Sequence, residues 1–382
     1  MPIPHLYVHI PFCASKCHYC AFNSYAGENS QLFDRYIAAL KREWNERGSR
    51  SLETIYVGGG TPSVLSGPQI HDLLTTLTRE AGNPDLREFT VEVNPGNTTP
   101  SFLEGILASG VDRVSMGVQT MDARRLKKLG RVHTPGDVRE SVSSLRKAGI
   151  KRISLDLIYG QPEQTLSEWI ADVKQLLELS PDHLSLYALQ YEEGTVYTQA
   201  KDRGKLAELE DHIILRMFEA AKDLLADHGF QFYELSNASK PGEESLHNIG
   251  YWKNRPYVGL GAGAYGGLGH LRYRNECAPE AYIDKVLRTG TAVVEEDPLD
   301  EWATYLECLS SGLRMMEGID LQDVERRTGL NPAKAHASHV HKLLETGLAE
   351  LKGQRLSLTW DGLWLLDTLM LPFLEAPDSV PA

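Results

Sequence analysis

Three cysteines near the start of the chain carry the most specific chemical signal. Cys13, Cys17 and Cys20 follow a predicted strand with the spacing C-x3-C-x2-C. Thiolates are soft ligands that suit iron–sulfur clusters or zinc. Structural zinc takes four protein ligands, so a histidine such as His9 or His18 would have to complete a zinc site. Three thiolates on a four-iron cluster leave one iron open to a small molecule. The tight grouping favours such a cluster over three buried structural cysteines.

Polar residues and glycines lie in or directly after four further predicted strands, toward the carboxyl end of each. They are the segment Gly58–Pro62, Glu92, Gln119 and Asp156. In parallel α/β folds, ligands bind at the carboxyl ends of the strands. Each position alone has an ordinary explanation, as a strand-to-helix turn or a helix cap. Five successive strands with such groups at the same end, the cysteine strand included, predict one shared site.

Short apolar strands and amphipathic helices must position these residues, and they alternate from residue 6 to about residue 237. Few charges interrupt the strands, which is typical of a sheet covered on both faces. Six or seven strand–helix units predict a parallel sheet, either a full or partial barrel or a doubly wound open sheet. The predicted strands are Leu6–Phe12, Ile55–Gly59, Phe89–Asn94, Arg113–Gln119, Arg152–Tyr159 and His183–Leu189, with a seventh at Phe230–Leu235.

The composition changes near residue 295. The acidic segment Glu295–Pro298 predicts a linker, and residues 295–382 contain 16 acidic against seven basic side chains, which argues against duplex binding. The elements expected after the linker resemble a winged-helix arrangement. They are helices at Ala303–Met315, Leu321–Thr328 and Pro332–Leu344, a hairpin near Gly353 and Gln354, and a final apolar helix. Three histidines lie in the third predicted helix at a spacing that does not bring them together on one face: His336, His339 and His341. We therefore expect them to lie on a solvated part of the helix and not to form a shared site.

The overall composition excludes several classes of protein. With 382 residues, 42% hydrophobic and 24% charged, the chain is typical of a globular protein of two domains, or a barrel with an appendage. The net charge of −13 argues against nonspecific nucleic-acid or anionic-membrane binding. No apolar stretch reaches the length of a membrane span, and Met1–Phe12 lacks a secretory signal. We therefore expect a cytoplasmic protein with reduced cysteines, and Cys277 and Cys308 lie in no motif.

The cysteine motif resembles that of the radical S-adenosylmethionine (radical SAM) superfamily. Further segments resemble the oxygen-independent coproporphyrinogen III oxidase family and its relatives: Tyr7–Cys13, Gly58–Pro62, Glu92–Pro95, Gly117–Gln119, Gly130 with Arg131, and Asp156–Pro162. The resemblance implies an α/β fold, a partial (β/α)6 barrel followed by a smaller, mainly helical, winged-helix-like C-terminal domain. It suggests a barrel at residues 1–237, a heme-motif and glycine-rich connecting segment at 238–294, and the C-terminal domain at 295–382.

The same resemblance implies the cofactors. Cys13, Cys17 and Cys20 would hold a [4Fe-4S] cluster whose open iron binds S-adenosylmethionine. Glycines let backbone amides approach the methionine moiety, carboxylates can hold its ammonium and the ribose hydroxyls, and an arginine can pair its carboxylate. The implied S-adenosylmethionine residues are Tyr7, Tyr19, Gly59, Gly60, Thr61, Glu92, Gln119, Arg131 and Asp156.

Two branches of this family differ in function. The oxidases carry a fourth cysteine where this chain has Phe22, and more residues before the motif. The segment His247–Trp252 resembles the H-N-x-x-Y-W motif of HemW-type heme chaperones, which implies heme bound by His247, Asn248, Tyr251 and Trp252. A histidine beside aromatic residues is ordinarily a core residue, so the six-residue match carries this interpretation.

The leading hypothesis is thus a heme chaperone that delivers heme to hemoproteins, and the family suggests a homodimer. The alternatives are a coproporphyrinogen III oxidase and a radical enzyme with another substrate. Tyr265 stands where the family often has histidine. The segment Gly261–Gly266 matches G-x-G-x-x-G, but no apolar helix follows it, so we exclude a dinucleotide site.

Overall fold

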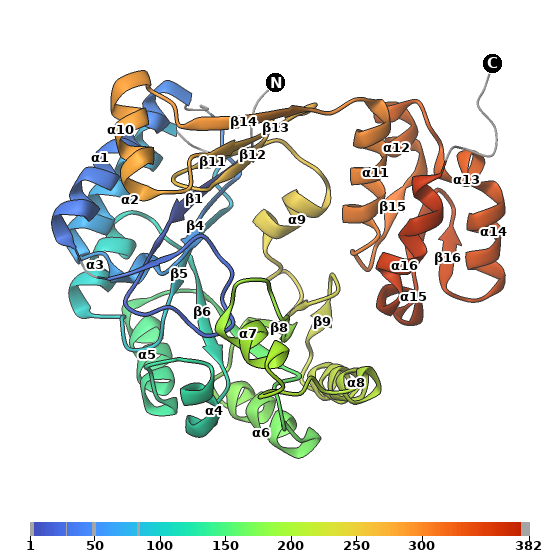
Figure 1. The fold of residues 1–382 in the computed structure, drawn as a ribbon, viewed down its shortest axis with the longest axis horizontal. Helices are drawn as coiled ribbons and strands as arrows, with labels where there is room; N and C mark the ends of the chain where they lie inside the picture. Colours follow the sequence, from blue (N-terminus) through green and yellow to red (C-terminus); the bar gives the residue numbers. More distant parts are fainter. Residues whose placement is uncertain (1–3, 28, 48–50, 82–84, 376–382) are drawn as a thin grey trace.

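Six parallel strands form the centre of the protein in a computed structural model (Figure 1). The structure describes residues 4–27, 29–47, 51–81 and 85–375, so the ends of the first and last predicted domains, 1–3 and 376–382, lie outside the described residues. The α/β class and the partial barrel are confirmed. The strands lie side by side in chain order: β1 (His5–Ile10), β4 (Thr54–Gly59), β5 (Glu88–Val93), β6 (Arg113–Gln119), β7 (Arg152–Tyr159) and β8 (His183–Ala188).

Helices connect the strands on the outside of the sheet (Figure 1). Local signals set their ends: Thr134 and Asp137 form a capping box before α5, and Gly149 ends it with a left-handed φ of 98°. The helices are α1 (Ser30–Arg47), α2 (Gly67–Ala81), α3 (Pro100–Ala108), α4 (Ala123–Lys128), α5 (Pro135–Ala148), α6 (Leu166–Leu177), α7 (Val196–Asp202) and α8 (Asp211–Asp227), with a 3-10 turn η1 (Pro62–Val64).

The two faces of the central strands differ in chemistry. Leu6, Val8 and Ile10 of β1 are buried in the large apolar core with the helices. The opposite face carries polar side chains that contact one another across strands, such as Tyr56 of β4 and Glu92 of β5. Alternation along a strand places neighbouring residues on opposite faces. The outer face is therefore covered by helices, while the inner face encloses a polar interior, which the few charges along the strands did not indicate.

Further strands, most of them antiparallel to their neighbours, extend both edges of the six parallel strands. The predicted seventh strand is only β9 (Gln231–Phe232), which pairs with β10 (Asn237–Ser239), itself antiparallel to β8. On the other edge, β11 (Tyr257–Leu260) runs parallel to β1. It is followed by β12 (Tyr265–Gly267), β13 (Leu271–Asn275) and β14 (Val293–Pro298), and a small ribbon joins β2 (Phe12–Cys13) to β3 (Tyr25–Ala26).

The predicted linker at Glu295–Pro298 is wrong, because these residues belong to β14. The strand pairs antiparallel with β13, and Arg274 forms an ion pair with Glu295 at 2.9 Å. Backbone hydrogen bonds hold this edge strand while its acidic side chains point into solvent, which also protects the edge from pairing with another chain.

The C-terminal region has its own apolar core, which includes Tyr305, Leu309 and Phe373. It stands beside the barrel in Figure 1, and α9 (Leu246–Trp252) lies next to its first helix. The three predicted helical stretches and the predicted hairpin are present, which confirms the winged-helix-like arrangement. The elements are α11 (Glu301–Gly312), β15 (Ile319–Asp320), α12 (Leu321–Thr328), α13 (Pro332–Ala335), α14 (Ala337–Glu345), β16 (Ala349–Lys352), β17 (Arg355–Leu358), α15 (Trp360–Trp364), α16 (Leu366–Met370) and η2 (Leu371–Leu374), after α10 (Pro279–Thr289).

One expectation for this region is wrong. His336 is buried, stacked on Tyr305 at 5.8 Å and edge-on to Phe373 at 5.1 Å between ring centroids. The helix expected over 332–344 breaks at His336, which turns the imidazole into the core. His341 is exposed beside Glu345, as expected. Within the described residues, no helix combines the length and apolar character needed to cross a membrane.

Candidate functional site

The cysteine loop leaves the carboxyl end of β1 and returns through β3. Cys13 ends β2, and the backbone N–H of Cys20 donates to the carbonyl of Cys17 at 3.2 Å. The loop is fixed to the barrel because the N–H of His18 donates to the carbonyl of Leu129. All three thiols are free and partly exposed, in the loop that follows the carboxyl end of β1.

A chain of polar side chains connects two of these thiols. Thr61 Oγ1 donates to Cys13 Sγ at 3.5 Å, and Asn94 Nδ2 donates to Thr61 Oγ1 at 2.9 Å. Arg131 donates to Asn94 Oδ1 at 2.7 Å and to Cys17 Sγ at 3.5 Å. The chain runs across the ends of β4 and β5 and the loop after α4. It fixes the thiols relative to the strand ends before any ligand binds.

A single zinc ion fits this loop poorly. Both ring nitrogens of His9 are engaged, by the Tyr7 hydroxyl at 2.8 Å and by the Asn23 carbonyl at 2.8 Å. Nδ1 of His18 is held by the Lys128 carbonyl at 2.8 Å. Among the described residues, no set of three or more His, Cys, Asp or Glu side chains converges as ligands of one metal ion would. A cluster, in contrast, takes each thiolate on a different iron, so its ligands need not converge on one point.

Glu92 lies inside the barrel just behind the cysteine loop. Its carboxylate accepts hydrogen bonds from the Tyr56 hydroxyl at 2.7 Å and from the Gly59 N–H at 3.1 Å. Burial raises the pKa of Glu92 to about 7, and the neighbouring Asp156 adds to the shift. A Cβ at Gly58 would lie 2.7 Å from the Glu92 carboxyl carbon, so a side chain there would displace this carboxylate.

The other residues expected around S-adenosylmethionine also come together here. Asp156 accepts from Ser115 Oγ at 3.2 Å, and burial raises the pKa of its carboxyl. Gln119 follows a bulge in β6 with a left-handed φ of 70°. The Tyr19 hydroxyl interacts with Cys17, and Tyr7 stacks on Tyr56 at 6.2 Å. The glycine turn packs on β1 and β2, where Gly60 N–H donates to the Ile10 carbonyl.

This donor set fits the groups that the resemblance implies. Three thiols lie in one loop, two buried carboxylates lie at the nearby strand ends, and the Arg131 guanidinium bonds Cys17 and Asn94. Three contributors were not singled out from the sequence: Tyr56, Asn94 and Arg113, whose charge opposes the rise in the pKa of Glu92 and Asp156. Asn94 lies in the segment Glu92–Pro95, whose resemblance to the family could have identified it. The roles of Tyr56 and Arg113 depend on which face of a strand they occupy, and only the register shows this.

The H-N-x-x-Y-W motif lies at the other end of the barrel. His247 of α9 is 1% exposed and bonds Thr54 Oγ1 through Nδ1 at 2.7 Å. Its Nε2 pairs with the Tyr251 hydroxyl at 2.9 Å. Thr54 and Glu88 begin β4 and β5, and Glu88 accepts from the Leu246 N–H at 2.7 Å at the start of α9. The motif therefore meets the amino ends of the strands, opposite the cysteine loop.

The expectation that His247 ligates heme does not fit this arrangement. Both of its nitrogens are hydrogen-bonded, its ring stacks on Tyr56 at 5.1 Å, and burial holds its pKa well below the usual value. A neutral imidazole could bind iron, but it would have to leave this buried network first. In this structure His247 and Tyr251 anchor α9 to the barrel.

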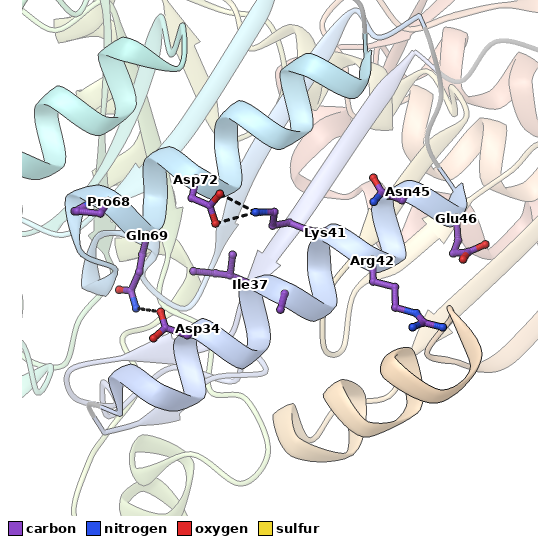
Figure 2. Close-up of a pocket in the computed structure, with 10 residues that line it drawn as sticks. Asp34, Ile37, Lys41, Arg42, Asn45, Glu46, Pro68, Gln69 and Asp72 are labelled. Atoms are coloured by element: carbon purple, nitrogen blue, oxygen red, sulfur yellow. Dashed lines mark hydrogen bonds and ion pairs between the residues drawn. The ribbon is translucent and has the colours of Figure 1, made fainter.

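A surface groove between α1 and α2 offers no comparable chemistry (Figure 2). It has a volume of about 800 Å³, and two pairs of its polar side chains are joined across the two helices. Lys41 Nζ donates to Asp72 at 2.7 Å, and Gln69 donates to Asp34 at 2.6 Å. These contacts join two helices on the outside of the barrel, away from the strand ends.

Comparison with known proteins places this geometry in a family. The radical SAM superfamily model matches residues 7–176, and the HemN C-terminal domain model matches residues 299–365. The chain is 38% identical to the heme chaperone HemW of Lactococcus lactis subsp. lactis, over 96% of both chains. It is 35% identical to the heme chaperone HemW of Bacillus subtilis, over 96% of this chain and 98% of that one.

A solved structure shows the same fold. The coproporphyrinogen III oxidase HemN of Escherichia coli, a radical SAM enzyme, matches with a TM-score of 0.84 and 23% identity. The match covers 97% of this chain and 90% of that one, so both the barrel and the C-terminal region share its architecture.

Proposed function

The chain belongs to the radical SAM superfamily, in the family of the heme chaperone HemW, and from this premise we propose that it binds heme and delivers it to hemoproteins. The observation that carries this proposal is the similarity to relatives named heme chaperone HemW along nearly the whole chain. A cytoplasmic location and association of two chains belong to the same proposal.

The cofactor part of the proposal rests on the site. Cys13, Cys17 and Cys20 would hold a [4Fe-4S] cluster, and the residues around Glu92 and Asp156 would hold S-adenosylmethionine. When bound, this pair supplies one-electron chemistry at the sulfonium. The residues of the chain bind and orient: Glu92 and Asp156 favour a cationic ligand inside the barrel, and the guanidinium between Asn94 and Cys17 can also pair a carboxylate.

One experiment tests the heme and cluster parts on the same sample. Anaerobically reconstituted protein is analysed for iron, titrated with heme by absorbance, and then assayed with coproporphyrinogen III and S-adenosylmethionine. We expect about four irons per chain, a Soret band shifted from that of free heme, and no protoporphyrinogen. Absence of heme binding by this protein would contradict the chaperone proposal.

An oxidase is the second candidate, because the fold matches that of HemN. Phe22, at the position where the oxidases carry a fourth cysteine, is 70% exposed beside the cluster loop and supplies no ligand. Formation of protoporphyrinogen in the assay above would establish the oxidase and exclude a chaperone without that activity.

A further inference from the structure

Helix α9 packs against the barrel on one side and borders a cavity on another side. His247 and Tyr251 lie one turn apart and face the barrel, where each satisfies the other. Trp252 is five residues after His247, which is about 140° further around a helix of 100° per residue. Its side chain therefore lies on another side of α9, where Arg314 stacks over the indole at 5.2 Å. The last residue of the motif thus faces the C-terminal region.

Trp252 lines a cavity of about 900 Å³ on that side. The cavity lies between the end of α9, the turn joining β12 to β13, and the helices α11 and α12 of the C-terminal region. Sites for cofactors and other small molecules are commonly of this size, and they occur preferentially between domains. Arg327 fixes its shape by bonding the carbonyl oxygens of Lys253 and Asn254, at 3.4 and 3.5 Å.

The wall of the cavity combines apolar surface with donors for iron. Trp252, Pro256, Met315 and Ile319 supply the apolar part. His270 also lines the cavity, and it is exposed. Its Nδ1 makes a long contact of 3.4 Å with Thr304 of α11, and within the described residues its Nε2 has no hydrogen bond. Imidazole is a common axial ligand of heme iron.

The rim of the cavity is basic, although the chain is acidic. Five cations line it against three carboxylates, in a chain of net charge −13: Lys253, Arg255, Arg326, Arg327 and Arg355. Arg326 and Arg355 are largely exposed side chains whose ion pairs, with Asp323 and Glu317, lie in water. Such pairs hold little energy and can exchange for another carboxylate.

We propose that this cavity, and not the buried His247, is the binding site for the heme that the chain carries. The ring lies against Trp252 and the apolar wall, His270 Nε2 binds the iron, and Arg326 and Arg355 pair with the propionate carboxylates. The proposal rests on the proposed function, because it takes heme as the cargo. His247 is then a positioning residue, which fixes α9 so that Trp252 lines the cavity.

The test is a heme titration of the full chain, followed by the Soret band, with four single variants or combinations. His270→Ala removes the proposed ligand, and His228→Ala is a matched control at an exposed histidine at the end of α8. Arg326→Ala with Arg355→Ala removes the rim cations. His247→Ala is compared after circular dichroism has shown that it is folded. Heme with esterified propionates serves as a second ligand.

We expect His270→Ala to lose the wild-type Soret position and to bind heme about tenfold more weakly or worse, while His228→Ala matches wild type. The variant with both Arg326→Ala and Arg355→Ala should bind heme about tenfold more weakly than wild type. Its affinity for the esterified heme should equal that of the wild type. Folded His247→Ala should keep the wild-type Soret position. A wild-type spectrum for His270→Ala, or loss of the Soret shift only in folded His247→Ala, overturns the cavity site. Failure of the wild type to bind heme overturns the proposed function itself.

Discussion

Replacing Glu92 by glutamine should change both the stability and its pH dependence. Burial holds the pKa of Glu92 at about 7 in the folded protein. An unfolded chain ionises near the ordinary glutamate value of about 4.3, so between these two values only the folded state keeps the proton. The wild type therefore loses stability as the pH rises from about 4.5 to 7, by roughly 3 kcal/mol at 1.36 kcal/mol per pKa unit. Glu92→Gln has no such loss.

The same carboxyl should couple S-adenosylmethionine binding to a proton. The ligand is cationic at its sulfonium and ammonium, so it favours the ionised form of Glu92. Below pH 7 the carboxyl must release its proton on binding, and wild-type affinity should fall by up to about tenfold per pH unit. At pH 8 Glu92→Gln should bind about tenfold or more weakly, because it loses a charge-assisted contact. Its affinity should be independent of pH between 6 and 7, where the ligand's amino group stays protonated.

Two measurements check this reasoning. Urea unfolding of wild type and Glu92→Gln at pH 5 and pH 8 gives the difference in stability, which should grow in favour of the variant as the pH rises. Calorimetric titration of the reconstituted protein at pH 6, 7 and 8 gives the affinity, and iron analysis confirms an intact cluster. The reasoning is refuted if both proteins show the same pH dependence, or if the affinity of the variant equals that of the wild type at pH 8.

Three further predictions concern the cluster, the polar chain and the core. Cys17→Ser should lose most of its iron after reconstitution while Cys277→Ser keeps it, because serine is a poorer ligand for this iron; stoichiometric zinc in place of iron would contradict the cluster. Asn94→Ala should keep its iron and bind S-adenosylmethionine about tenfold more weakly in calorimetry, because Arg131 loses its 2.7 Å acceptor; unchanged affinity would mean that Arg131 needs no support. Glu43→Ala should cost about 3–5 kcal/mol in urea unfolding, because this buried carboxylate joins α1 to the segments around β11 and β13; a loss below about 1 kcal/mol would show that the site relaxes.

The cysteine loop shows what short-range sequence can determine. All three thiols lie within eight residues, so their spacing alone limits the ligands that they can hold. The strands and the residues at their carboxyl ends could also be predicted from the sequence, because apolar runs, helix caps and terminal glycines are local signals. Arg113–Gln119 and Arg152–Tyr159 have in the structure the bounds that the sequence predicts.

The sequence did not show which face of a strand or helix would be buried against other residues. Tyr56 belongs to the site because its register places it beside Glu92, and β14 is a strand because β13 offers backbone partners 18 to 27 residues earlier in the chain. Neither fact is encoded within a short window.

The histidine motif makes the same point about function. Its residues are adjacent in sequence, and their match to the family motif suggested one common ligand site. In the structure His247 enters a buried network with Thr54 and Tyr251, while Trp252 lines a cavity formed with residues far along the chain, such as His270 and Met315. Sequence by itself indicated the family, the positions of the central strands and the grouping of three cysteines after the first of them, because these are local patterns. Tertiary structure decided which side chains remain available, because a hydrogen bond or a cavity wall is completed by residues that only folding brings together.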